Sequence, residues 1–177
     1  MEVSKFKGER EQEIIEVFFR AFCDSEGETE GKAIKELVTQ LFKFTKSNQA
    51  QCYFSRNSKG EVSGAVFFTP LRYENNEEVW MLSPMAVQTV EQGHGVGQRL
   101  IKYALDELAN QGIKSVCTYG DPAFYGKLGF EGVTTHRLPA PFPLSQPEGW
   151  LWKRFMNHQD IQGKPHCVGP FESPDLW

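Results

Sequence analysis

Gln92-Gly93-His94-Gly95-Val96-Gly97-Gln98-Arg99-Leu100 is the stretch that decides the fold of this chain. It follows an apolar run at residues 78–87, which predicts a strand, and it opens a helix predicted over residues 95–110. Glycines let backbone N–H groups turn toward a ligand, and a helix N-terminus adds partial positive charge. The stretch is therefore a candidate phosphate-binding loop, although the glycines alone favour a turn that lets a helix and a strand pack closely.

Two common phosphate-binding patterns do not fit this stretch. The dinucleotide pattern GxGxxG fails, because its last position is Gln98 when counted from Gly93 and Leu100 when counted from Gly95. The P-loop pattern fails because no Gly-Lys-Ser/Thr follows. The loop is therefore of another kind.

Working outward, the spacing of apolar residues and the turn signals predict one strand or helix after another. Before the loop they give helices over 9–23 and 31–44 with an acidic loop at 24–30, and strands over 52–54, 62–68 and 78–87. After it they give strands over 113–118, 130–136 and 149–155 and a short helix over 122–128. Pro84 predicts a bulge or a split in its strand. The whole order is α-α-β-β-β-α-β-α-β-β, with a strand before the first helix left open, and it predicts a mixed α/β sheet with one parallel strand pair around the glycine loop.

Composition limits the class of protein. A length of 177 residues suits one domain over residues 1–177. The net charge of -4 disfavours nucleic acid as a partner, and no apolar run is long enough to span a bilayer. The N-terminus lacks the apolar core of a secretory signal, and the four cysteines form no CxxC pair. Reduced thiols and a cytoplasmic location are the expectation.

Three motifs together resemble the GCN5-related N-acetyltransferases (GNAT). Gln92, Gly95 and Gly97 match the Gln-x-x-Gly-x-Gly loop that binds the pyrophosphate of acetyl-CoA in that family. Residues 81–87 resemble its splayed fourth strand, and residues 125–130 resemble its Tyr-x-x-x-Gly-Phe segment. The resemblance implies the GNAT fold, with a central mixed sheet flanked by helices, and acetyl-CoA as the cosubstrate of an N-acetyltransferase.

The resemblance also implies the residues of the site. Those expected to contact coenzyme A are Met85, Ala86, Val87, Gln92, Gly93, His94, Gly95, Val96, Gly97, Gln98, Arg99, Asp121, Phe124 and Tyr125. It assigns the oxyanion donor to the backbone N–H of Val87 and the proton for the departing thiolate to Tyr125. A packing aromatic is the structural alternative for Tyr125. The run Gly-Asp-Pro-Ala-Phe-Tyr at 120–125 departs from the Asn-containing segment of many members and is similar to a broad bacterial branch of predicted acetyltransferases.

The acceptor side is less visible in the sequence. Glu26, with Glu28 and Glu30, lies in the expected acidic loop, which in the family borders the acceptor site. These carboxylates favour a primary amine on a small molecule or a protein, and Glu26 is the candidate base, although a solvated acidic loop is the alternative. The proline segment 138–149 is expected to wall the acceptor pocket or simply to be a stiff surface loop.

Other chemistry is disfavoured. Cys117 has no histidine near it in sequence, so direct transfer is expected rather than an acyl-cysteine. The histidines and Cys167 lack metal-ligand spacing, so no metal is expected. Aromatic residues in the tail, 163–177, are expected to dock on the domain or on a second subunit, which makes a homodimer a further candidate. The rival functions are a non-catalytic acyl-CoA-binding module and an adaptor that uses the basic helix face.

Overall fold

The computed structural model describes residues 1–158 and 161–177. Contacts divide the chain into two units. One comprises Met1–Phe68 and Pro84–Ala104, and the other comprises Thr69–Ser83 and Leu105–Trp177. Strands β3 (Val62–Arg72) and β4 (Glu78–Val87) and helix α3 (Val96–Asn110) run from one unit into the other. The single domain expected over residues 1–177 stays a prediction.

The first unit holds the N-terminal strands and the two helices that the apolar periodicity predicted. Besides its parts of β3, β4 and α3, it contains β1 (Glu2–Lys5), α1 (Glu11–Glu26), α2 (Glu28–Thr45) and β2 (Gln51–Arg56). The strands follow the order β1-β2-β3-β4, and β2 pairs antiparallel with both β1 and β3. The strands expected at 52–54 and 62–68 are thus confirmed, each extended by a few residues.

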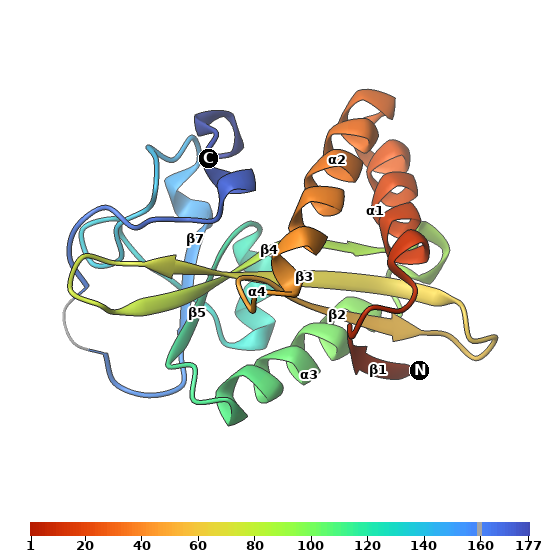
Figure 1. Ribbon diagram of the computed structural model, residues 1–177, viewed down its shortest axis with the longest axis horizontal. Helices are drawn as coiled ribbons and strands as arrows, with labels where there is room; N and C mark the ends of the chain where they lie inside the picture. The colour runs from red at the N-terminus through yellow and green to blue at the C-terminus, as the bar shows by residue number, and fades with distance from the viewer. Residues whose placement is uncertain (159–160) are drawn as a thin grey trace. The chain divides into compact units, whose positions relative to one another are not determined.

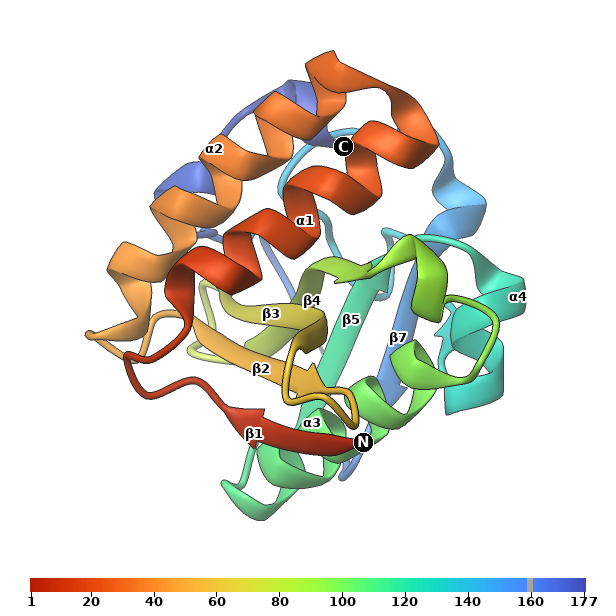
Figure 2. The same cartoon turned by 90° about the vertical axis from the view of Figure 1, so that its right-hand side faces the viewer.

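Both faces of β2 and β3 are covered in this unit. Helices α1 and α2 lie side by side on one face, and α3 lies on the other (Figures 1 and 2). On the first face the ring of Phe67 packs against Phe18 and Phe42, with centroids 6.0 and 5.0 Å apart. On the opposite face Tyr53 contacts Tyr103 of α3 at 6.3 Å. Double cover explains why the residues of these strands are buried along almost the whole length instead of alternating between buried and exposed.

The prediction of an acidic loop at residues 24–30 is wrong. Only Gly27 separates α1 from α2, so Glu26 is the last residue of α1, while Glu28 and Glu30 lie in the first turn of α2. Gly27 adopts φ 103°, a conformation that glycine reaches at little cost, and one residue is therefore enough to change the chain direction. Carboxylates in a first helical turn also interact favourably with the helix dipole, so the acidic residues stabilise the start of α2 although their composition is typical of a loop.

The second unit is built on β5 (Ser115–Tyr119), which lies between β4 and β7 (Trp150–Arg154). Residues 80–82 of β4 pair in parallel with residues 116–118 of β5, and β5 pairs antiparallel with β7. Helix α4 (Pro122–Tyr125) follows β5, and β6 (Glu131–Gly132) pairs with β7. The parallel pair confirms the strand-helix-strand connection predicted around the glycine loop, and the seven strands form the expected mixed sheet.

Two strand expectations need correction. Strand β4 continues through Pro84 without a split, whereas a bulge there stays a prediction. The strand expected over 130–136 has only two residues, because the carbonyl of Thr134 accepts the N–H groups of Arg137 and Leu138 and the chain turns there.

The aromatic tail packs on its own unit. Phe171 and Trp177 are 3% and 6% exposed, and Trp177 packs against Phe142 and Trp150 at 6.4 and 6.1 Å. The indole Nε1–H of Trp177 donates to the carbonyl of Phe171. Docking of the tail on the domain is therefore confirmed. Within the described ranges, no helix is both long and apolar enough to cross a membrane.

Candidate functional site

The glycine loop leads from the end of β4 to the start of α3. After a short 3-10 turn at Thr89–Glu91, Gly93 and Gly95 adopt φ 77° and 75°, which L side chains rarely do. The nearest atom to a Cβ built at Gly95 would be Arg99 Nη1 at 3.6 Å, so the backbone is open to an approaching group. The first amides of α3 have no acceptor within the helix. Together these features make a site for an anion.

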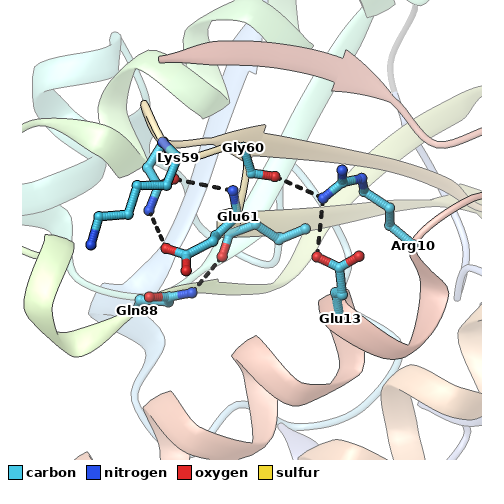
Figure 3. Close-up of polar contacts among 8 residues, drawn as sticks. Arg10, Glu13, Lys59, Gly60, Glu61 and Gln88 are labelled. Atoms are coloured by element: carbon cyan, nitrogen blue, oxygen red, sulfur yellow. Dashed lines mark hydrogen bonds and ion pairs between the residues drawn. The ribbon is translucent and has the colours of Figure 1, made fainter.

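Two hydrogen bonds connect the region around the β2–β3 turn to its neighbours (Figure 3). One joins it to the start of α1, and the other joins the first residue of β3 to the chain just before the glycine loop. Arg10 Nη1 donates to the carbonyl of Gly60 at 2.8 Å and pairs with Glu13 of α1 at 3.0 Å. The side-chain amide of Gln88, directly after β4, donates to the carbonyl of Val62. The loop therefore begins at a position that the sheet holds in place, as an accurate binding site requires.

The predicted loop residues differ in their hydrogen bonds and in their exposure. The side-chain amide of Gln92 donates to the carbonyl of Val87 at 3.0 Å and so braces the loop against the end of β4. Of the others, Gly93, His94 and Arg99 are exposed, Gly95 and Gln98 are half-buried, and Val96 and Gly97 are buried. Because Val96 points into the core, only its backbone is available to a ligand, whereas His94 and Arg99 present side chains.

The backbone N–H of Val87 points away from β3. The next residue, Gln88, donates its own N–H to the carbonyl of Ser63 on β3 at 2.9 Å. Successive residues of a strand direct their N–H and C=O groups to opposite edges, so Val87 faces the other edge of β4, where its carbonyl accepts Gln92. Met85 shares that edge, and Ala86 between them is buried and faces β3. Val87 thus has the orientation that an oxyanion donor needs.

The run at 120–125 has a local physical explanation for each conspicuous residue. Asp121 caps α4, because its carboxylate accepts the backbone N–H of Ala123 at 2.8 Å. Pro122 occupies the first helical position, where its missing N–H costs nothing. A Cβ at Gly120 would lie 2.7 Å from Cε2 of Tyr125, so glycine here makes room for the phenol ring. The residues at 120–122 therefore start helix α4 and leave space for the Tyr125 ring.

The phenol ring of Tyr125 packs against two other aromatic rings. Its ring lies between Phe124 and Phe130, with centroids 5.0 and 5.6 Å away. Burial raises the pKa of Tyr125 above its ordinary value, and the Asp121 carboxylate adds to the shift. At neutral pH the group is therefore a protonated phenol.

Thr118 of β5 lies beside that phenol, and its hydroxyl lowers the pKa of Tyr125 against the larger effect of burial. The Thr118 hydroxyl donates to the carbonyl of Leu82 at 3.0 Å. This neighbour of Tyr125 was missed in the sequence because Thr118 is an ordinary strand residue.

The remaining candidate groups differ in their burial and in their partners. Cys117 is fully buried, and burial raises the pKa of its thiol, which removes the thiolate that an acyl-cysteine route needs. Glu26, Glu28 and Glu30 are exposed. Glu28 pairs with Lys32 at 2.7 Å, and this hydrogen bond lowers the pKa of Glu28. In the part of the chain that the structure describes, no three His, Cys, Asp or Glu side chains gather as a metal would require.

Part of the proline segment lines a cavity of about 430 Å³ in the second unit. Ser145, Gln146 and Glu148 form one side of it, and residues 119–122 form the other. The Tyr119 hydroxyl bonds Ser145 at 3.0 Å and accepts the N–H of Gln146 at 2.6 Å. The segment is therefore a cavity wall. The tryptophans beside it, Trp150 and Trp152, are buried in the core.

The predicted site residues fall into two sets. The glycine loop with Val87 and Glu26 belongs to the first unit, and Asp121, Phe124 and Tyr125 belong to the second. Glu26 is the last residue of α1, and Asp24 near the same helix end accepts a hydrogen bond from Thr89, just before the loop. The roles of all these residues stay predictions.

Comparison with known proteins gives this arrangement a family. The model of the acetyltransferase (GNAT) family matches residues 12–130. The chain belongs to the GNAT family. It is 34% identical over 88 residues to the uncharacterized N-acetyltransferase YhbS of Escherichia coli, a stretch that covers 49% of this chain and 53% of YhbS. The chain thus spans about half the length of this curated relative.

Two further GNAT relatives extend over more of the chain. The uncharacterized N-acetyltransferase YjhQ of Escherichia coli is 28% identical over 148 residues, 80% of this chain and 81% of that protein. A GNAT acetyltransferase from Brucella melitensis, solved in complex with acetyl-CoA, superposes with a TM-score of 0.71 at 20% identity, covering 96% and 97% of the two chains. The sequence similarity to YjhQ supports the family, and the similarity to the Brucella melitensis structure shows the fold.

The GNAT match contains both sets of predicted residues and ends at Phe130, the last residue of the Tyr-x-x-x-Gly-Phe segment. Strand β7, the proline segment and the tail lie beyond it.

Proposed function

We propose that this GNAT chain is an N-acetyltransferase that transfers the acetyl group of acetyl-CoA to a primary amine by direct attack. The glycine loop carries this proposal, because Gly93 and Gly95 at positive φ turn backbone amides outward beside the N-terminus of α3. The pyrophosphate of coenzyme A binds these amides, and Arg99, exposed one turn into the helix, is available to a further phosphate.

The reaction requires that the acceptor nitrogen attack the thioester carbonyl carbon, forming the C–N bond and breaking the C–S bond. Negative charge collects on the carbonyl oxygen as the nitrogen attacks, and the N–H of Val87 donates to it. The departing thiolate takes its proton from Tyr125. The ordinary pKa of a phenol lies above that of a thiol, and burial raises the pKa of Tyr125 further, so the phenol is protonated before this step.

The acceptor nitrogen must also lose its proton to be reactive. Exposed carboxylates at the α1–α2 junction, Glu26 foremost, attract a cationic amine and accept its proton directly or through water. The amine belongs to a small molecule or to a protein. The cavity beside Tyr119 and the proline segment provides room for it.

Two measurements test the proposal. Isothermal titration with acetyl-CoA, coenzyme A and NADH should show binding of the first two alone, and no binding of either would refute the loop assignment. Tyr125→Phe should lower kcat with an accepted amine by about 10²–10⁴, the usual contribution of a general acid, without changing coenzyme A affinity. Tyr103→Phe, which removes a 40% exposed phenol elsewhere, is the matched control. Unchanged turnover in Tyr125→Phe would refute the general-acid role of Tyr125, whereas coenzyme A binding without turnover of any amine by the unsubstituted chain would favour a binding module.

A further inference from the structure

Gly64 lies inside strand β3, where a glycine normally weakens the strand. Its φ is outside the left-handed region, so the backbone conformation does not require glycine. The requirement is one of space. A Cβ built at this position would lie 3.1 Å from the carbonyl oxygen of Ala86, 3.2 Å from Cγ2 of Val87 and 3.4 Å from Oγ of Ser55. Glycine therefore lets the neighbouring strand β4 approach closely.

The oxygen that Gly64 faces belongs to the peptide group between Ala86 and Val87. A peptide group is planar and trans, so the carbonyl oxygen of Ala86 and the N–H of Val87 point in opposite directions. With that oxygen on the side of Gly64, the N–H points away from β3. It is the N–H that the proposed function uses as the oxyanion donor. Because the group is planar, a displacement of its oxygen also turns its N–H.

Hydrogen bonds at the next residue keep β3 and β4 from moving apart here. The N–H of Gln88 donates to the carbonyl of Ser63 at 2.9 Å, and its side-chain amide donates to the carbonyl of Val62 (Figure 3). On the side of β2, the hydroxyl of Ser55 lies 2.8 Å from that of Ser63, and both side chains are buried. A methyl group at position 64 is thus accommodated by rotation of the adjacent peptide group rather than by separation of the strands.

We infer that Gly64 is a positioning residue for the oxyanion donor: the missing side chain leaves the N–H of Val87 free to point at the thioester carbonyl. The inference rests on the proposed function, in which this N–H stabilises the charge that develops on the carbonyl oxygen. The side-chain amide of Gln92 binds the carbonyl of Val87, which belongs to the following peptide group. The support of the glycine loop is therefore separate from the orientation of the donor.

Gly64→Ala should lower kcat without loosening coenzyme A. With an accepted amine, kcat should fall at least about tenfold, since a lost oxyanion donor costs about 10²–10³ and a rotated one costs part of that. Coenzyme A affinity, measured by isothermal titration, should stay within about twofold, because the glycine loop is unchanged.

Val66→Ala is the matched control for this experiment. It shortens a fully buried side chain on the same strand, so it should lower the thermal stability by leaving a cavity and should keep kcat. If kcat is the same in Gly64→Ala and Val66→Ala, Gly64 has no positioning role.

A second measurement needs no turnover and separates this inference from the proposed function. In the full chain enriched in ¹⁵N, the backbone amide resonance of Val87 is compared between the coenzyme A and acetyl-CoA complexes. The resonance should differ between them, because only acetyl-CoA offers a thioester carbonyl to the N–H. In Gly64→Ala the difference should be lost while both ligands still bind. A difference of full size in Gly64→Ala would overturn the inference, whereas no difference in the unsubstituted chain would refute the donor role of Val87 on which it rests.

A Val87→Ala background keeps the test decisive if Gly64→Ala alone does not fold. Val87→Ala removes Cγ2, one of the crowding atoms, and keeps the backbone N–H. The carbonyl oxygen of Ala86 still lies 3.1 Å from the new Cβ, so adding Gly64→Ala should lower kcat below that of Val87→Ala alone. Equal kcat in these two chains would contradict the positioning role.

Discussion

Replacing Gly95 by valine tests the glycine loop most directly. Gly95 has φ 75°, and a left-handed conformation costs an L-residue about 1–2 kcal/mol. Space is not the obstacle, since the nearest atom to a new Cβ would be 3.6 Å away. The substitution should therefore cost about 1–2 kcal/mol of stability through backbone strain, which lowers Tm by roughly 2–8 °C in a chain of this size. Relief of that strain requires the loop amides to turn.

Gly112→Val is the matched control for this experiment. Gly112 follows α3 at φ 82° and has no atom within 4 Å of its Cβ position, so its strain should be similar. Thermal unfolding should show comparable losses in the two variants. Isothermal titration should show coenzyme A affinity at least about tenfold weaker, or 1.4 kcal/mol, in Gly95→Val alone. Equal affinity in both variants would show that the loop is a packing turn.

Three further outcomes follow from single contacts. Thr118→Val removes the hydrogen bond to the Leu82 carbonyl and should cost about 0.5–1.5 kcal/mol by urea unfolding, whereas Thr118→Ser should keep that stability. Gly31→Ala should cost about 1–3 kcal/mol, because its Cβ would lie 3.1 Å from a backbone oxygen of α1, while Gly132→Ala, with open space, should change little. The folded state lowers the pKa of His158, so stability present above pH 6.5 should be lost as pH falls, and His158→Gln should flatten that loss.

The glycine loop shows why local sequence predicts some features well. Gly93 and Gly95 were expected to turn the backbone, and both have positive φ. The parallel strand pair on either side of α3 was also predictable, because apolar runs and a glycine stop mark the three elements. In each case residues near one another in sequence contain the whole signal.

The acidic segment shows where local composition misleads. Charged residues with one glycine suggested a loop over 24–30, yet the chain is helical on both sides of Gly27. Packing of the apolar stripes of α1 and α2 extends both helices to that glycine, and tertiary contacts of this kind override composition.

By itself, the sequence determined the mixed α/β order, the glycine loop at a helix N-terminus and the Gly-Asp-Pro-x-x-Tyr run, since each depends on neighbouring residues and on conformations that only glycine or proline favours. Tertiary structure alone decided which partners the polar groups find. It placed Thr118 against Tyr125, and it brought Glu77, Lys114 and His158 together across gaps of 37 and 81 positions. The protonation and orientation of a side chain depend on burial and on groups distant in sequence, so that chemistry appears only in the folded chain.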